Sequence, residues 1–351
     1  MKRLILMLMI VVLVIGCSSN DNTSGPSEYT PSASQLLNET FMSISLGEER
    51  EIQVYLPAGY DDAEMANMTY PLIIFLHGAN STPSSYSGLG KAILDNLISD
   101  STIHSAIIAF PNSRGGVEPF RNPFYTNSTV NGDYEDYIIN DVIDYMDANY
   151  RTTGTPAERA IMGHSMGGYG AMKLALKHQD MFAAVATHSG PFDFAQFPGL
   201  IPYLLAENGG SGPFLAVDSS FTLLSWSMAC AFSPNPDATP YPADFPVDND
   251  GNIIESIFAR WEAHNPALIA VEMAPYDNMA IYFDCGTMDE LGVYPTDVAF
   301  DDTLTAHGIE HTFVSYVGTH TSGLITRFPI ALVFIDGAMH PAAATMMAFT
   351  H

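Results

Sequence analysis

Basic residues are scarce in this chain. Its 351 residues include 12 Lys and Arg against 39 Asp and Glu, which gives a formal net charge of −27 with histidine neutral. Proteins that bind DNA or RNA gain much of their affinity from Lys and Arg side chains that neutralise phosphates. We therefore exclude nucleic acid as a main partner. The chain is 47% hydrophobic and 15% charged, a composition that predicts a folded domain rather than a disordered segment.

Cysteine is also rare, with three residues in the whole chain. Cys230 and Cys285 do not form the spacing of a disulfide framework, so the sequence leaves open whether they pair or are two buried thiols. It contains neither a CxxC nor an HExxH motif. No local spacing therefore predicts a structural or catalytic zinc site.

The apolar run near the start of the chain is too short to span a membrane. Residues 4–15 are apolar and follow Lys2 and Arg3, which is the pattern of a secretory signal. The run ends in Gly16-Cys17, which resembles the box at which bacterial lipoproteins are cleaved and lipidated. We expect residues 1–16 to be a lipoprotein signal peptide and Cys17 to be the lipidation site. The protein would then be exported and held at a membrane by its N-terminal lipid, at the outer membrane or cell surface, or it would be periplasmic.

Residues 17–40 are predicted to be a flexible tether. Their first part is rich in Ser, Asn, Thr, Pro and Gly, a composition typical of linkers. We expect a single folded domain over residues 41–351.

Strands and helices alternate along most of this domain. The alternating pattern of residues 51–56 predicts an antiparallel edge strand, and the apolar runs at 72–76 and 105–110 predict parallel strands buried on both faces. Further strands are expected at 159–162, 182–187, 280–283 and 311–317, with helices at 91–99, 133–150 and from the 163–168 turn to about 178. This order predicts an α/β fold with a mostly parallel sheet and helices on both faces.

The alternation stops at about residues 192–275. This stretch is rich in proline and holds both tryptophans, Trp226 and Trp261. An insertion between sheet strands predicts a cap over the strand ends. Residues 248–252 are similar to a calcium loop, but Pro246 and Ile257 occupy positions of calcium ligands. We therefore expect a tight turn there.

Residues 163–167 (GHSMG) match the G-x-S-x-G pattern between a predicted strand and a predicted helix. A serine at such a sharp turn is presented at the top of the sheet, and the flanking glycines let neighbouring backbone pass. A glycine-rich turn with an idle serine is the alternative. The context favours Ser165 as a nucleophile.

A serine hydroxyl needs a histidine base to become a good nucleophile, and the base needs an acid to orient it. With this motif the chain order is Ser, acid, His. His320 is the preferred base because it lies in the loop after the last predicted strand. His307 and His311 are expected to be structural or solvated, and His188 either lines the site or packs in the core.

Three carboxylates near residue 285 are candidates for the acid. Asp284 lies at the end of a predicted strand, where the pleat fixes its direction, whereas Asp289 lies far enough into the loop to reach His320. We favour Asp289, then Asp284, then Glu290.

Backbone amides are the expected donors to the oxyanion of a tetrahedral intermediate, and each such donor lowers the barrier by roughly 3 to 4 kcal/mol. The amide of Met166 begins the helix after the nucleophile. The loop at residues 77–79 follows the first apolar strand, and the amide of Ala79 is the second predicted donor.

These motifs together resemble the esterase D-like branch of the α/β hydrolases, which contains S-formylglutathione hydrolases, feruloyl esterases, enterochelin esterases and mycolyltransferases. The resemblance rests on Tyr150-Arg151, GHSMGGYGA at 163–171, LALKH at 174–178, Phe182 and Ser189-Gly190, with weaker matches at 54–57, 76–78, 285–289 and 318–320. It implies an α/β-hydrolase fold, a Ser165, Asp289, His320 triad and no cofactor. His164 stands where this branch often has Leu, and no aromatic residue follows His320 directly.

The expected function is that of an exported serine carboxylesterase that acts on a small-molecule or polymer-linked ester through an acyl-enzyme. An acyltransferase of the mycolyltransferase type is the second hypothesis, and a surface binding lipoprotein on a hydrolase scaffold is the third. Aromatic residues of the insertion form either an acyl pocket or the core of the cap, namely Phe192, Phe194, Tyr203, Trp226 and Trp261.

Overall fold

The computed structural model describes residues 29–341. The chain divides into residues Met1–Pro31 and a compact unit that begins at Ser32. The predicted signal peptide, Cys17 and most of the predicted tether lie outside the described residues. Among the helices of residues 29–341, none has the length and apolar character that a membrane crossing requires.

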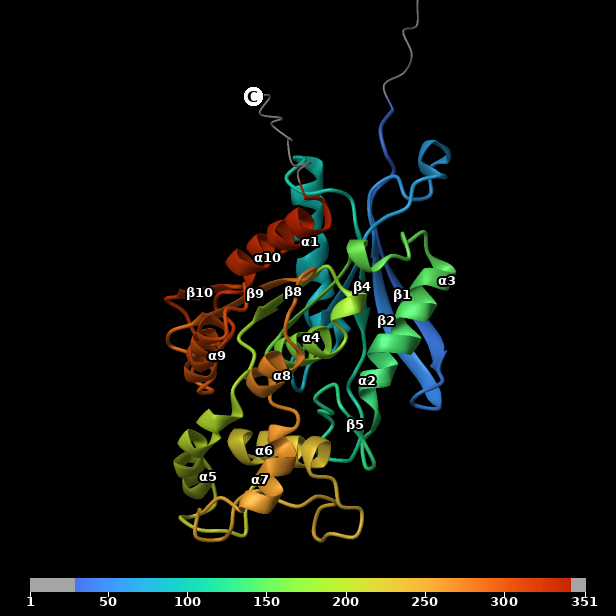
Figure 1. Ribbon diagram of the computed structural model, residues 1–351. Coiled ribbons are helices and arrows are strands. Elements are labelled where there is room, and N and C mark those ends of the chain that lie inside the picture. Colours follow the sequence, from blue (N-terminus) through green and yellow to red (C-terminus); the bar gives the residue numbers. More distant parts are fainter. Residues whose placement is uncertain (1–28, 342–351) are drawn as a thin grey trace, which may run out of the picture. The chain divides into compact units, whose positions relative to one another are not determined.

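A sheet of eight strands forms the centre of the compact unit within the described residues (Figure 1). Its spatial order is β1-β2-β4-β3-β7-β8-β9-β10. Strand β2 runs antiparallel to both of its neighbours, β1 and β4, and all pairs from β4 to β10 are parallel. The strands are β1 (Gln35–Ser43), β2 (Glu48–Leu56), β3 (Leu72–Leu76), β4 (Ile107–Pro111), β7 (Arg159–His164), β8 (Ala184–His188), β9 (Ala280–Gly286) and β10 (Thr312–Tyr316).

Helices cover both faces of this sheet (Figure 1). Side chains alternate along each strand, so that Ile73 and Phe75 of β3 contact one helical layer while Leu72, Ile74 and Leu76 contact the other. The strand is apolar throughout because both of its faces are buried. One layer consists of α1 (Ser87–Ser99) and α10 (Leu324–Met339), and the other of α2 (Tyr134–Asp136), the π-helical segment η3 (Tyr137–Val142), α3 (Ile143–Asn149), α4 (Met166–Lys177), α8 (Pro266–Met273) and α9 (Tyr294–Ala306).

The first strands differ from the sequence-based expectation. Strand β1 starts at Gln35 and pairs with β2 from Gln35↔Leu56 to Ser43↔Glu48, so the predicted tether over residues 17–40 extends too far. Residues 51–56 do not form an edge strand, because β2 pairs with both β1 and β4. Edge strands such as β1 carry polar side chains that face solvent. Their composition is therefore similar to that of a linker, and the sequence does not separate the two. The helix predicted over residues 133–150 is interrupted by a π-helical stretch.

The insertion between β8 and β9 contains η6 (Phe194–Leu200), α5 (Ile201–Glu207), α6 (Ser220–Phe232) and α7 (Glu255–Glu262), after which α8 returns to pack against α4. Helices α5 to α7 lie together beyond one end of the sheet (Figure 1). Trp261 is fully buried against Phe197 and Phe232 within this group. This apolar group is continuous with the core under the sheet, since Phe232 also packs against Phe124 and Tyr169. The turn at 248–252 is closed by the Asp248 amide donating to the Asn252 carbonyl at 2.9 Å.

The two cysteines within the described residues are not paired. Cys230 in α6 and Cys285 in β9 are both buried free thiols. Burial raises the pKa of the Cys230 thiol to about 12. Both side chains therefore act as small apolar groups in the core.

Candidate active site

Ser165 occupies a strained turn between β7 and α4. Its backbone dihedrals are φ 57° and ψ −123°, a region that costs a non-glycine residue on the order of 1 to 3 kcal/mol. The turn fits because its neighbours lack side chains: a Cβ on Gly163 would lie 2.3 Å from the Gly167 carbonyl oxygen, and a Cβ on Gly167 would lie 2.0 Å from that of Leu76. The Ser165 amide donates to the His188 carbonyl at 2.9 Å, which fixes the turn to β8.

The three residues of the predicted triad meet at the carboxyl ends of the parallel strands. Ser165 follows β7, Asp289 follows β9 and His320 follows β10. His320 Nε2 lies 2.8 Å from Ser165 Oγ, and His320 Nδ1 lies 2.7 Å from Asp289 Oδ2. The side chains of His320 and Asp289 are 7% and 0% exposed. The structure thus joins the three side chains in one hydrogen-bonded chain.

The Asp289 carboxylate is held in its ionised form. Burial alone would raise the pKa of Asp289, but the hydrogen bond and charge of His320, together with backbone amides, keep that pKa below its ordinary value. One of these amides belongs to Leu291 and donates to Asp289 Oδ1 at 3.0 Å. A buried carboxylate in this position orients the imidazole ring.

The other two candidate acids have different partners. Asp284 binds His188 Nδ1 at 2.9 Å through one oxygen, and Arg327 Nε at 3.0 Å through the other. Glu290 accepts the backbone N–H of His320 at 3.0 Å, so it contacts the histidine at its backbone and not at its ring. His188 is 1% exposed and packs in the core beside Asp284.

His164, which the sequence marked only as a departure from the esterase D-like pattern, connects two loops of the site. Its Nε2 lies 3.0 Å from the His320 carbonyl oxygen, and its Nδ1 lies 2.9 Å from the Tyr86 hydroxyl. A carbonyl can only accept, so His164 carries its proton on Nε2 and accepts at Nδ1. Burial, assisted by the charge of His320, lowers the pKa of His164 to about 3 and keeps the ring neutral.

The loop after β3 is fixed by contacts on both sides. The Tyr86 hydroxyl accepts the Gly78 amide at 3.3 Å, and the Asn122 side chain accepts the Asn80 amide at 2.8 Å. His77 Nε2 accepts the Ser113 amide at 2.9 Å, and burial lowers the pKa of His77 to about 4. These contacts hold rigidly the loop that carries Ala79.

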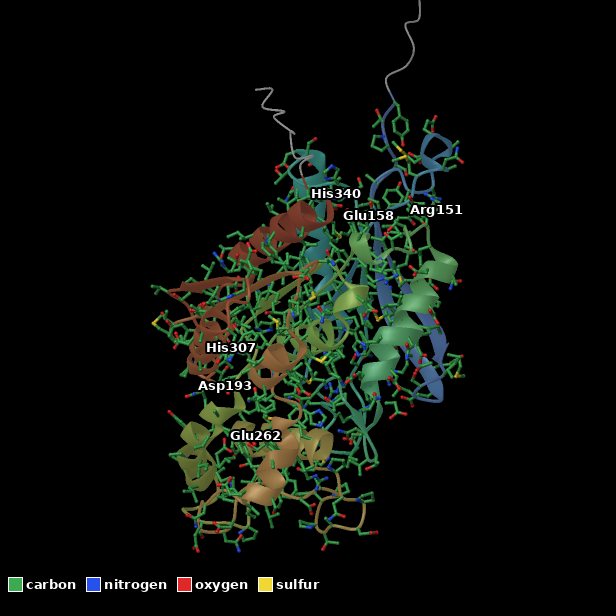
Figure 2. The ribbon with its side chains drawn as sticks, in the orientation of Figure 1. Arg151, Glu158, Asp193, Glu262, His307 and His340 are labelled. Carbon is green, nitrogen blue, oxygen red and sulfur yellow. The ribbon has the colours of Figure 1, made fainter. Side chains whose placement is uncertain are left out.

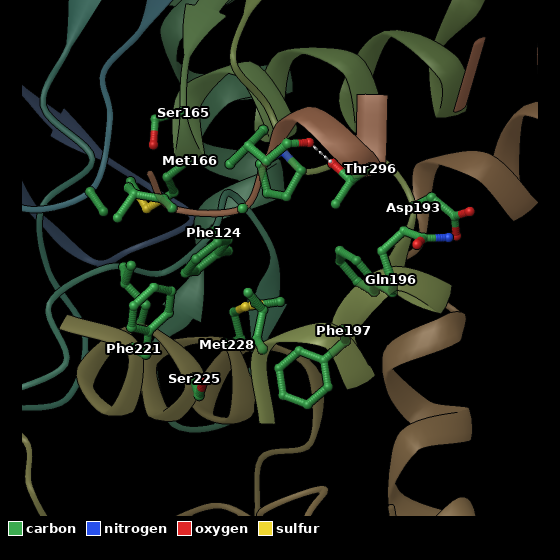
Figure 3. Close-up of a pocket in the computed structure, with 18 of the residues that line it drawn as sticks. Phe124, Ser165, Met166, Asp193, Gln196, Phe197, Phe221, Ser225, Met228 and Thr296 are labelled. Carbon is green, nitrogen blue, oxygen red and sulfur yellow. Dashed lines mark hydrogen bonds between the residues drawn. The ribbon is translucent and has the colours of Figure 1, made fainter. Parts of the chain in front are cut away.

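Two pockets meet at Ser165 and His320, and each encloses about 760 Å³ of space, part of it open to solvent. We call them the apolar pocket and the polar pocket. Figure 3 shows Ser165 at one end of the apolar pocket, with α6 opposite it and Phe124 between. The apolar pocket is lined mainly by Phe124, Met166, Phe194, Phe197, Leu200, Phe221, Met228 and Val293. The polar pocket is so called because it has more polar side chains than the other pocket, although part of its wall is apolar. It is lined by Asn80, Ser81, Tyr86, His164, Asp218, Ser219, Ser220 and Thr321, and also by Leu223, Leu224 and Leu291.

Both predicted oxyanion donors border this space. Met166 lines the apolar pocket, and Ala79 lines both pockets together with Ser165 and His320. Of the five aromatic residues proposed for an acyl pocket, Phe194 is among the lining residues. Trp226 and Trp261 instead pack within the insertion, and Tyr203 is 54% exposed. Phe124, Phe221 and Met228 had no sequence signal because the loops and helices that carry them lie far from the motif.

The sequence model of an esterase family, described as "Putative esterase", matches residues 43–323 of this chain. The matched residues include Ser165, Asp289 and His320. The chain belongs to this esterase family. The predicted resemblance to esterases and the predicted α/β-hydrolase fold are confirmed.

Curated relatives match one part of this esterase-family chain. Esterase Rv1288 of Mycobacterium tuberculosis is 30% identical over 164 residues, which make up 46% of this chain and 33% of that protein. An endo-1,4-beta-xylanase/feruloyl esterase of Xylanibacter ruminicola is 31% identical over 154 residues, or 43% of this chain and 21% of that protein. The matches span a third or less of the length of these relatives.

Solved structures of esterases have the same fold. A ferulic acid esterase is 22% identical with a TM-score of 0.62, covering 88% of this chain and 100% of the other. An S-formylglutathione hydrolase from Staphylococcus aureus is 20% identical with a TM-score of 0.58, covering 87% of this chain and 100% of the other. At this level of identity the similarity establishes the α/β-hydrolase architecture.

Proposed function

We propose that this chain is a serine carboxylesterase. The observation that carries the proposal is the hydrogen-bonded chain from Ser165 Oγ through His320 to Asp289. Ser165 lies on a strained turn and faces two pockets. Membership of the esterase family supports the same conclusion.

In the proposed mechanism, Ser165 Oγ attacks the ester carbonyl carbon while His320 Nε2 takes the hydroxyl proton. The amides of Met166 and Ala79 donate to the oxyanion of the tetrahedral intermediate. The intermediate collapses, the C–O bond to the alcohol breaks, and His320 returns its proton to the departing alkoxide. Water then attacks the acyl-enzyme, giving its proton to His320, and the acid leaves as Ser165 regains a proton. Asp289 orients the imidazole and stabilises its positive form.

The two pockets suggest how an ester would be oriented. A carbonyl carbon bonded to Ser165 has its acyl group on one side and its alcohol on the other. Apolar groups bind where they leave water for an apolar wall, and hydroxyl-rich groups bind where polar side chains remain available. We infer that the acyl group occupies the apolar pocket and that a polar alcohol, such as a sugar hydroxyl, occupies the polar pocket.

Turnover of p-nitrophenyl acetate and butyrate by the full chain and by Ser165→Ala tests the activity. The variant should lose at least about 10³-fold in kcat, and equal rates in both proteins would remove the proposal. A panel of short acyl, long acyl and hydroxycinnamoyl esters tests the orientation. Met228→Ala should change the preference among acyl groups and leave the preference among alcohols unchanged.

An acyltransferase is the second candidate because the polar pocket at Ser165 offers space for an acceptor alcohol. The same acyl-enzyme would then pass its acyl group to that alcohol instead of to water. Product analysis with a competing alcohol separates the two reactions, since a transferase forms the new ester in preference to the free acid.

We further propose that the enzyme is exported and anchored by a lipid on Cys17. The basic start, the apolar run at residues 4–15 and the Gly16-Cys17 pair support this proposal. Cys17→Ser should abolish incorporation of labelled fatty acid and move the enzyme from the membrane to the soluble fraction. Unchanged labelling in the variant would contradict lipidation at Cys17.

A further inference from the structure

Two histidines and an aspartate lie close together beyond the amino ends of the parallel strands, at the end of the sheet opposite to Ser165. His104 lies in the loop just before β4, Asp336 lies in the last turn of α10, and His340 follows that helix. Strands β4 and β7 are both parallel to β3, which lies between them. The amino end of β4 and the carboxyl end of β7 therefore lie at opposite ends of the strands. Figure 2 shows His340 at the end of the unit away from the insertion.

The ligand atoms of these side chains have the spacing of a metal site. His104 Nδ1 lies 3.1 Å from each oxygen of Asp336, and His340 Nδ1 lies 3.3 Å from Asp336 Oδ1. One ligand atom from each residue can be chosen so that all lie within 4.8 Å of one another. Ligands bonded at about 2.0 to 2.1 Å in a tetrahedral site lie about 3.3 to 3.4 Å apart. To bring both nitrogens to this separation, the rings would have to turn out of their stack, and His340 Nδ1 would have to release the Asp336 carbonyl oxygen that lies 3.2 Å away.

The surroundings orient the carboxylate and favour a cation. The backbone amide of His104 donates to Asp336 Oδ1 at 2.9 Å, the kind of outer contact that fixes a metal ligand. The rings of His104 and His340 stack with their centroids 4.0 Å apart, so an ion bound by both rings requires them to rotate apart until each points a nitrogen at it.

The last turn of α10 contains no basic residue, although the C-terminal end of a helix attracts positive charge. Within residues 29–341, Asp336 forms ion pairs only with the two histidines, which carry charge only when protonated. A divalent cation would supply the missing positive charge without requiring either stacked ring to be protonated.

We propose that His104, Asp336 and His340 bind a divalent transition-metal ion. Two imidazoles and one carboxylate suit Zn²⁺, Co²⁺, Ni²⁺ or Cu²⁺, and a water would complete a four-coordinate site. The side chain of His104 is 64% exposed, which gives the ion a path of entry. Since His104 and Asp336 are 232 residues apart in the chain, the ion acts as a clip between α10 and the loop before β4.

The test uses Zn²⁺ and the untagged full chain, first treated with a chelator and then dialysed. Calorimetric titration and elemental analysis should find one Zn²⁺ bound at this site per chain, and Zn²⁺ should raise the Tm because it binds the folded state. His104→Ala and His340→Ala should each abolish the uptake and the rise in Tm. His307→Ala removes another exposed imidazole and should retain both, as the matched control.

Asp336→Asn keeps an oxygen acceptor for the His104 amide and removes the charge. It should weaken Zn²⁺ uptake while its Tm in chelator stays close to that of the unmodified chain, which separates loss of the ligand from loss of the fold. Visible absorption of bound Co²⁺ should report four-coordination in the unmodified chain alone. Uptake that is absent, or equal in the unmodified chain and the His104→Ala and His340→Ala variants, would overturn the proposal and leave a hydrogen-bonded His–Asp cluster. Esterase activity should not depend on Zn²⁺, so the test is independent of the proposed function.

Discussion

Two aspartate–histidine pairs lie side by side at the carboxyl ends of the central strands, and they differ in what surrounds them. Asp289 binds His320 at 2.7 Å and Asp284 binds His188 at 2.9 Å, in both cases through Nδ1 of the ring. His320 Nε2 faces Ser165 Oγ, whereas His188 Nε2 is buried and has no hydrogen-bond partner in the described part of the chain. A buried Asp–His pair is therefore insufficient for the proposed chemistry without a nucleophile at the second nitrogen.

The two carboxylates also differ in the positive charges beside them. Asp284 is shared between His188 and the Arg327 guanidinium, so part of its charge is already balanced by a permanent cation. Asp289 binds no Lys or Arg among the described residues, and its ring partner is His320 alone. Its charge is available to stabilise the imidazolium that forms when Ser165 gives up its proton. The comparison supports the proposal that the Asp289 pair is the catalytic one and that the Asp284 pair packs in the core.

The largest expected effect separates the two pairs directly. Asp289→Asn should lower kcat by about 10⁴-fold, because the amide favours the wrong tautomer of His320. Asp284→Asn should instead lower the free energy of unfolding by about 3 to 5 kcal/mol, since it leaves the Arg327 charge unpaired in a largely buried position. Urea unfolding and steady-state kinetics on both variants measure the two effects. A comparable loss of kcat in the folded Asp284→Asn protein would contradict the different roles proposed for Asp289 and Asp284.

A smaller effect is expected for His164, which binds the backbone of His320 and not its ring. His164→Leu removes the donor to the His320 carbonyl and should lower kcat about 10- to 100-fold, because a small displacement of the base weakens its alignment with Ser165. KM should change little. His164→Gln places an amide donor in reach of the same carbonyl and should restore part of the rate, an outcome that a mere loss of ring packing would not produce.

A separate effect concerns stability in acid and leaves catalysis aside. Burial lowers the pKa of His164 to about 3 and that of His77 to about 4, while both imidazoles titrate near 6.5 in the unfolded chain. Protonation of these rings therefore costs no free energy of unfolding above pH 6.5. As the pH falls from 6.5 toward the pKa values of the folded state, the unfolded state binds more protons than the folded state, and the free energy of unfolding decreases. Each ring contributes a slope of about 1.4 kcal/mol per pH unit in that window.

His164→Leu should remove one of these contributions. The variant's free energy of unfolding should therefore fall less steeply between pH 6 and 4, by about 1.4 kcal/mol per pH unit. Urea denaturation at several pH values measures the slope, and an unchanged slope would contradict a buried neutral ring at this position.

Much of the fold and the main residues of the site were predictable from the sequence, because their causes are local. Glycines on either side of Ser165 are required by contacts with the adjoining backbone, and continuous apolar runs identify strands buried on both faces. The position of Asp289, three residues beyond the end of β9, is likewise visible in the order of the chain.

What could not be predicted depends on contacts between distant segments. The polar residues of β1 resemble a linker until β2 pairs with them. His164 acquires its role only because a carbonyl 156 residues away reaches its ring. The aromatic residues of the insertion could not be divided between pocket and core, since that division depends on which face of α6 turns toward Ser165. The cluster at His104 also has no local sequence motif.

The most direct test of the central claim is covalent labelling of the full chain by a fluorophosphonate, followed by mass spectrometry of the labelled peptide. The label should lie on Ser165, disappear in Ser165→Ala, form much more slowly in His320→Ala, and form at nearly the normal rate when His188 is replaced by Ala in a protein that remains folded. A label on another residue, or equal rates of labelling with and without His320, would contradict the account.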